Sequence, residues 1–311
     1  MPVTPRKAAT IILLREKAPK GFEVLLLKRH EKSNFFAGNY VYPGGGLEPQ
    51  DCVSDIHPFC GGLSPGEASR ILGGSTPPDE SLGYWVAAVR ELFEEAGILL
   101  AYGRKEPHCQ AELLTDPAKL SEYRASLQNK KLSFREMAQT EGLSLALDQV
   151  IYYAHWITPE ARPVRFDTRF FIARHPEGQE ANHDRQETTA RAWISPANAL
   201  EANLKGEIVL SPPTLKTLED LSRFQSIQDL FPRVREARKP SILPILTKVP
   251  EGPLLVFPWD PEYEVFKGGE TPSPMDHGHP ASLGDNSTRL LLKEGRWHPY
   301  CMDNIDFQQS E

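Results

Sequence analysis

Three glutamates within five residues are the group in this chain whose type and spacing could do chemistry. Glu91, Glu94 and Glu95 lie at positions i, i+3 and i+4, so on a helix their carboxylates project from one face. Clustered carboxylates repel one another unless positive charge lies between them, and a hard divalent cation with oxygen ligands supplies that charge. The spacing therefore predicts a Mg²⁺ or Mn²⁺ site in which Glu94 and Glu95 are the principal ligands and Glu91 is a third, directly or through water.

Neighbouring residues favour a metal site over the alternative, which is a solvated acidic helix face. Arg90 precedes the first glutamate, and we expect it to hold the carboxylates by charge-assisted hydrogen bonds. A glycine run lies upstream, and backbone without Cβ atoms can turn tightly and approach a diphosphate closely. We expect a backbone carbonyl of Gly44 to complete the metal ligands. The residues predicted to bind substrate at this place are Gly44, Gly45, Gly46 and Glu48.

The order of these motifs resembles the signature of a known hydrolase family. The segment 90–98, with the spacing R-E-x-x-E-E-x-G, resembles the second half of the Nudix box, and the glycine run with Glu48 resembles its first half. Here more than thirty residues separate Gly46 from Asp79. A box with a long insertion is similar to that of the peroxisomal coenzyme A diphosphatases called nucleoside diphosphate-linked moiety X motif 19, although the peroxisomal C-terminal tripeptide is absent. The similarity covers roughly residues 8–230, and its further motifs lie at 25–29, 36–38, 41–45, 51, 156–159, 165–171 and 210–213.

The resemblance implies a fold and a division of the chain. It implies an α+β class, an α/β/α sandwich of the Nudix type, with a Nudix domain over residues 1–240. Residues 49–78, rich in Gly, Pro and Ser, are expected to form an insertion loop within the box. Residues 241–311 are expected to form a proline-rich C-terminal extension that ends in a hairpin around Glu294 and Gly295.

The resemblance also implies an activity. It implies metal-dependent hydrolysis of a diphosphate bond, with coenzyme A or acyl-coenzyme A as substrate. The products would be adenosine 3′,5′-bisphosphate and 4′-phosphopantetheine or its acyl form. One alternative is a pyrophosphatase acting on ADP-ribose, NADH or another nucleotide. A second alternative is a non-catalytic module that binds a nucleotide or a protein, but such a module has no need of Arg90 and the three glutamates, all of which are present.

Other charged residues are candidates for the same site. Glu187 precedes a predicted strand, and the resemblance implies that it is an extra metal ligand or a general base; the alternative is an exposed loop carboxylate. Guanidinium groups give bidentate contacts to phosphate oxygens. The arginines considered for phosphate binding are Arg29, Arg162, Arg165 and Arg169. The alternative is that these arginines are solvated residues at strand ends.

Alternating strands and helices must position these residues. The glutamates are predicted to lie on a helix that has Asp79 or Ser81 as its N-terminal cap and stops at Gly97, a good left-handed C-terminal residue. The other predicted helices are 117–130, 134–146, 196–204 and 214–224, with 227–236 as a continuation. The predicted strands are 8–14, 22–28, 38–43, 150–156, 166–173 and 190–194, and the terminal hairpin pairs 289–293 with 296–300.

Composition limits the partners. A formal net charge of −7 argues against broad binding of nucleic acids or anionic membranes, while local basic patches could still hold one phosphorylated ligand. The resemblance implies a small nucleotide substrate as the partner. The apolar run 8–14 is too short to cross a bilayer. Four cysteines without a C-x-x-C or zinc spacing suit inert thiols in a reducing compartment, so we expect a cytoplasmic location. The oligomeric state, including a homodimer, stays open.

Overall fold

The computed structural model describes residues 2–32, 36–103, 116–181, 188–269, 278–282 and 285–302. Within these ranges no helix combines the length and the apolar character that crossing a membrane requires.

A mixed sheet forms the centre of the molecule. Its strands follow the order β10-β2-β1-β9-β8-β11, while β3 pairs with β2 and β4 pairs with β1. Strand β1 runs parallel to β9 and antiparallel to β2 and β4. The strands are β1 (Arg6–Glu16), β2 (Phe22–Arg29), β3 (Tyr40–Val41), β4 (Gly44–Gly46), β8 (Ile151–Ile157), β9 (Phe166–Arg174), β10 (Thr188–Ile194) and β11 (Ser241–Ile242).

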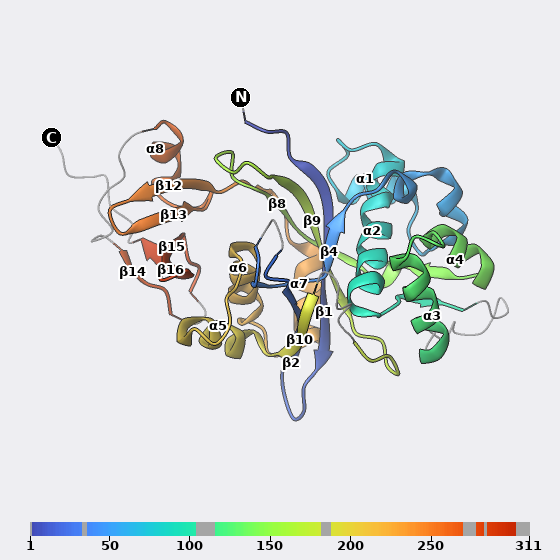
Figure 1. Ribbon diagram of the computed structural model, residues 1–311. Helices are drawn as coiled ribbons and strands as arrows, with labels where there is room; N and C mark the ends of the chain where they lie inside the picture. Colours follow the sequence, from blue (N-terminus) through green and yellow to red (C-terminus); the bar gives the residue numbers. More distant parts are fainter. Residues whose placement is uncertain are drawn as a thin grey trace.

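Helices cover both faces of this sheet. Successive side chains of β1 point to opposite faces, and the side chains on each face are apolar. Ile11 and Leu13 face one core, which includes α2, and Ile12 and Leu14 face a second core, which includes α5, α6 and α7. Figure 1 shows α2 and α6 on opposite sides of the central sheet. The predicted α/β/α sandwich is therefore confirmed. The helices of the two outer layers are α1 (Pro65–Ile71), α2 (Pro78–Ala96), α3 (Pro117–Gln128), α4 (Phe134–Glu141), α5 (Pro196–Lys205), α6 (Pro212–Leu221) and α7 (Ile227–Glu236).

Helix α2 carries the three glutamates. It begins at Pro78 with Pro77 as its N-terminal cap, whereas the predicted cap was Asp79 or Ser81, and it ends at Gly97, whose φ of 73° lies in the left-handed region. Its apolar side chains are buried against the sheet, where Trp85 donates from Nε1 to the carbonyl of Val150 at 2.9 Å. These contacts fix the rotation of the helix and hence the direction in which its acidic face points.

The segment inside the box forms regular structure that packs on α2. It contains the 3₁₀ helices η1 (Pro49–Cys52) and η2 (Ser54–Phe59), the strand β5 (Cys60–Gly61) and helix α1. Ser64 caps α1 by accepting from the N–H of Glu67 at 3.3 Å. A small sheet joins β5 to β7 (Ser144–Ala146) and β6 (Ala101–Tyr102). The predicted helix 134–146 is wrong after Glu141, because Gly142 (φ 58°) ends α4 and the chain continues into β7 and then η3 (Leu147–Gln149).

The C-terminal extension forms a second sheet beside the sandwich (Figure 1). The predicted hairpin around Glu294 and Gly295 is present as β15 and β16. Arg289 is fully buried here and donates to Asp260 at 2.8 and 2.9 Å. The elements of the extension are β12 (Ile245–Val249), β13 (Gly252–Val256), α8 (Tyr263–Lys267), β14 (Gly278–Pro280), β15 (Arg289–Lys293) and β16 (Arg296–Met302).

Candidate active site

The acidic face of α2 lies against the glycine strand β4. Glu95 accepts from the backbone N–H of Gly44 through Oε2 at 3.0 Å, although these residues are 51 positions apart in sequence. A Cβ atom at Gly45 would lie 2.3 Å from Oε1 of Glu91. The structure therefore brings two of the predicted metal ligands onto the predicted substrate-binding glycines, and it shows why the second glycine has no side chain.

The glycine run is a strand, so the predicted tight turn is wrong. Gly44 pairs with Thr10 on β1, and the flanking hydrogen bond from Ile11 N–H to the Pro43 carbonyl places Gly44 at a non-hydrogen-bonded position of the ladder. The N–H and C=O of a residue at such a position point away from the partner strand. The N–H of Gly44 reaches Glu95 in this way, and its carbonyl lies on the same side of β4.

Arg90 is the centre of this arrangement, and its side chain is 2 % exposed. It donates to both carboxylate oxygens of Asp51, at 2.9 and 3.0 Å, and to the carbonyl of Gly46 at 2.9 Å. It also donates to Oε1 of Glu91 at 2.8 Å and lies 3.6 Å from Oε2 of Glu94. One guanidinium thus links the box insertion, the glycine strand and the glutamate helix.

The carboxylates carry more negative charge than Arg90 neutralises. The pKa of Glu91 is raised to about 7, mainly by burial; Arg90 opposes this rise, and the charge of Glu94 contributes to it. Burial also raises the pKa of Glu94 above its usual value, again against Arg90 and with the charges of Glu48 and Asp51 adding to the rise. Because the charged forms of these carboxylates are unfavourable in the buried site, a bound cation would be stabilised there.

Helix α3 supports the end of α2, a role that the sequence did not indicate. Arg124 donates to the backbone carbonyls of Glu94 and Glu95 at 3.0 and 2.7 Å, and Gln128 donates to the Glu94 carbonyl at 2.9 Å. The last carbonyls of a helix have no partners within the helix, and a cation there also suits the helix dipole. These contacts hold the backbone from which the two glutamates project.

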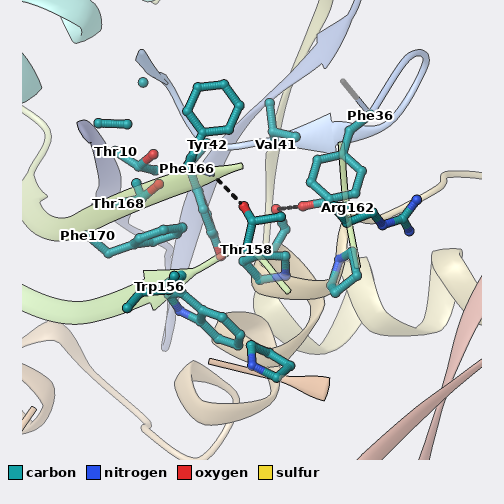
Figure 2. A pocket seen from close by; sticks show the side chains of 18 of the residues that line it. Thr10, Phe36, Val41, Tyr42, Trp156, Thr158, Arg162, Phe166, Thr168 and Phe170 are labelled. Carbon is teal, nitrogen blue, oxygen red and sulfur yellow. Dashed lines mark hydrogen bonds between the residues drawn. The ribbon is translucent and has the colours of Figure 1, made fainter. Parts of the chain in front are cut away.

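Two hollows lie beside this arrangement. One is a cleft of about 780 Å³ lined by the three glutamates, Glu48, Arg90 and side chains of the α3–α4 region. The other is a cavity of about 330 Å³ that lies against Gly44–Gly46 and is mostly apolar. Figure 2 shows it, with Trp156 and Phe170 on one side and Phe36 and Arg162 on another.

The predicted phosphate-binding arginines occupy different environments. Arg29 and Arg162 line the apolar cavity. Arg165 is buried and donates to the carbonyls of Thr158 and Val3 at 3.0 and 2.7 Å. Arg169 is buried too, pairs with Asp167 and lies over the ring of Tyr84. Arg165 and Arg169 line neither of the two hollows, and because both are buried they are not solvated strand ends.

Two more of the predicted site residues are the acids Glu187 and Glu48. Glu187 lies outside the described residues. Glu48 is exposed, and its backbone N–H donates to Asp51 at 2.9 Å while its carboxylate accepts from Gln50. The acid that contacts Arg90 from this segment is Asp51, which sequence reasoning used only as part of the resemblance.

A further set of ligand-type residues lies in the C-terminal extension. His279, Asp285 and Cys301 have their ligand atoms within 4.8 Å of one another. His279 and Cys301 are opposite each other on β14 and β16, and the carboxylate of Asp285 already accepts from the N–H of Ser282 at 2.7 Å. None of the three lines the cleft or the cavity, so this set is separate from the site at β4.

Comparisons with known proteins agree with this geometry. The family model described as the NUDT19 Nudix domain matches residues 5–223. The chain is 31% identical over 265 residues to "Acyl-coenzyme A diphosphatase NUDT19" from Gallus gallus, covering 72% of this chain and 70% of the relative. It is 29% identical over 301 residues to the protein of that name from Homo sapiens, covering 83% and 80%.

A solved structure supports the fold. The NUDIX hydrolase from Alicyclobacillus acidocaldarius superposes with a TM-score of 0.58 at 25% identity, covering 76% of this chain and 99% of that one. The matched family model spans the box with its insertion, the glycine strand and the glutamate helix. The chain is thus a Nudix hydrolase and belongs to the NUDT19 family.

Proposed function

We propose that this protein hydrolyses the diphosphate bond of coenzyme A or acyl-coenzyme A, giving adenosine 3′,5′-bisphosphate and 4′-phosphopantetheine or its acyl form. The observation that carries the proposal is the contact of Glu91 and Glu95 with the glycine strand, with Arg90 tying both elements together. The names of the relatives, which are acyl-coenzyme A diphosphatases, support this choice of substrate.

The residues fit the divalent cation that Nudix hydrolases generally use, and we propose Mg²⁺ or Mn²⁺. Carboxylate and carbonyl oxygens are the ligands that these hard cations prefer. Burial raises the pKa of Glu91 and of Glu94, and neighbouring carboxylates add to both rises, so a cation would stabilise the charged forms. Glu91, Glu94, Glu95 and the carbonyl of Gly44 would hold the ion. When bound, it neutralises phosphate oxygens and lowers the pKa of water.

The chain itself supplies position and proton transfer. Arg90 holds Glu91 and the Gly46 carbonyl at fixed places, so the diphosphate and the acids meet in one geometry. Backbone N–H groups and the absence of Cβ atoms let the substrate approach β4 closely. We propose that Glu94, Glu95 or Glu187 accepts a proton from the attacking water.

Replacement of Glu94 tests the proposed ligand set. We expect Glu94→Gln, assayed with Mg²⁺ and coenzyme A, to lose at least a hundredfold in kcat, because loss of one ligand costs several kcal/mol of transition-state stabilisation. Glu122→Gln on the exposed side of α3 is the matched control and should keep its activity. A Glu94→Gln protein that retains most of its activity would remove this glutamate from the metal site.

A substrate panel separates the alternatives. The protein is incubated with coenzyme A, ADP-ribose and NADH, each with Mg²⁺ and with EDTA, and the products are identified by mass spectrometry. We expect 4′-phosphopantetheine from coenzyme A only when the cation is present. Cleavage of ADP-ribose or NADH with coenzyme A left intact would favour the other pyrophosphatase activity.

The cellular setting also remains a proposal. We propose a cytoplasmic location, which is supported by thiols that suit a reducing compartment: burial raises the pKa of Cys52 to about 11 and that of Cys60 to about 12. The oligomeric state, with a homodimer as one possibility, is open to a light-scattering measurement.

A further inference from the structure

The apolar cavity beside β4 is built from parts of the chain that lie far apart in sequence. Its base is formed by β1 and by the glycines that also contact the acids, and its walls come from β8 and β9. The C-terminal extension closes it, because Pro244, Leu255 and Trp297 are among its lining residues. At about 330 Å³ the cavity is within the range of small-molecule sites.

Its position assigns it to one half of the substrate. Gly44 connects the cavity to the acidic cleft, because it lines the cavity and its N–H donates to Glu95, which lines the cleft. A diphosphate that is held at the acids therefore has one of its two substituents beside the cavity. In coenzyme A those substituents are a 3′-phosphorylated adenosine and the pantetheine arm.

Charge at the cavity distinguishes the two halves. Arg29 and Arg162 line it, and among the described residues neither guanidinium has an ion pair or a side-chain hydrogen bond. The Nε atom of Arg29 is buried without a partner. Other cations nearby are satisfied, since Lys28 pairs with Glu31 and Arg165 binds backbone carbonyls. The cavity thus has two unpaired cations while the site as a whole is acidic.

A neutral pantetheine arm would leave the buried donor of Arg29 unsatisfied, which is costly. A phosphate dianion would accept charge-assisted hydrogen bonds from the buried Nε of Arg29 and could also attract the exposed guanidinium of Arg162, which lines the same cavity. The walls suit the rest of that half, because Trp156, Phe166 and Phe36 offer flat aromatic surfaces to a base. Figure 2 shows Phe36 and Arg162 on the side of the cavity away from Thr10 and Thr168, as expected if the ribose lies between the diphosphate and the 3′-phosphate.

We propose that this cavity binds the 3′-phosphorylated adenosine half of the substrate, and that Arg29 and Arg162 select for the 3′-phosphate. The proposal rests on the proposed function for the identity of the substrate. It assigns to the C-terminal extension the role of completing the nucleotide site. It also replaces Arg165 and Arg169 as phosphate-binding residues.

Equilibrium binding in the presence of EDTA tests this without hydrolysis. We expect the protein to bind adenosine 3′,5′-bisphosphate at least tenfold more tightly than AMP, in line with charge-assisted hydrogen bonds to one phosphate. Arg29→Gln and Arg162→Gln should each lower the affinity for the bisphosphate roughly tenfold and leave the affinity for AMP nearly unchanged. Arg235→Gln on the exposed face of α7 removes the same charge elsewhere and should change neither affinity.

The outcomes are distinct from those of the activity assay. Equal affinities for the bisphosphate and AMP, or arginine variants that retain the wild-type difference, would overturn the inference even if coenzyme A is hydrolysed. Arginine variants that weaken binding of 4′-phosphopantetheine instead would also overturn it, because the cavity would then hold the other half. A 3′-phosphate preference in a protein that leaves coenzyme A intact would support the nucleotide site while refuting the proposed reaction. In each case circular dichroism checks that the variants are folded.

Discussion

Removal of the charge of Glu91 should stabilise the metal-free protein. Its side chain is 13 % exposed, and burial raises its pKa to about 7 from a usual 4.5. The folded state therefore binds this proton more tightly than the unfolded state does. Without a cation, the free energy of unfolding falls as the pH rises from about 4.5 to about 7 and stays low above that range. The same carboxylate is one of the proposed metal ligands.

The size of the effect follows from the shift. At 1.36 kcal/mol per pKa unit, the rise from 4.5 to about 7 corresponds to about 3 kcal/mol at pH 8. Glu91→Gln removes this penalty and keeps an oxygen that can accept from Nη1 of Arg90, which lies 2.8 Å from the native Oε1. We expect the variant to be more stable than the wild type by up to about 3 kcal/mol at pH 8 in EDTA. At pH 4.5 the difference should be small.

Denaturant unfolding at pH 4.5 and pH 8, each with EDTA and with Mg²⁺, measures these differences. Magnesium should stabilise the wild type at pH 8 and stabilise Glu91→Gln less, because binding to the folded state adds to its stability. Activity with Mg²⁺ should fall in the variant although its metal-free stability rises. If Glu91→Gln is no more stable than the wild type at pH 8 in EDTA, the carboxylate is not held at an electrostatic cost and the reasoning fails. Glu122→Gln, on the exposed side of α3, should show no such pH-dependent gain.

Two further substitutions test the contacts around this group. Gly45→Ala would place a Cβ atom 2.3 Å from Glu91 Oε1, so we expect activity to fall at least tenfold, whereas Gly66→Ala in the exposed first turn of α1, with nothing within 4 Å of the added atom, should remain close to wild type in a steady-state assay. Asp51→Ala leaves the buried guanidinium of Arg90 without its bidentate partner, so we expect a loss of about 3 to 5 kcal/mol in denaturant unfolding together with a fall in kcat. Unchanged stability in Asp51→Ala would show that this ion pair is dispensable.

The glutamate helix could be predicted because its signal is local. The i, i+3 and i+4 spacing depends only on helix geometry, and Gly97 marks the end of α2 by its own φ preference. The limits of α4 were harder to predict. Residues 134–146 carry an apolar pattern that suits a helix, but Gly142 takes a φ of 58° and the following residues pair with β5 and β6. That pairing depends on strands more than forty residues away, which local pattern does not reveal.

The glycine strand is a second feature that the local sequence pattern does not predict. Consecutive glycines suggest a turn, because they tolerate any backbone conformation. In the structure Gly44–Gly46 are extended and paired with β1, and the requirement for glycine at position 45 comes from the neighbouring carboxylate of Glu91. The arginines give a further case, since side-chain type alone could not separate Arg165, which binds backbone carbonyls, from Arg29, which lines the cavity.

The insertion inside the box contributes directly to the site. Arg90 is 2 % exposed, and a buried guanidinium needs partners that satisfy its donors and its charge. Glu91 and Glu94 cannot be those partners alone, because the proposed metal competes for the same oxygens. Asp51, at the start of the inserted segment, is held by η1 at 2.9 Å from Nε and takes this role without facing the metal side. A box without this insertion would need another acid to pair with Arg90. We therefore expect Asp51 and η1 to be more important for activity than residues 54–77 of the insertion.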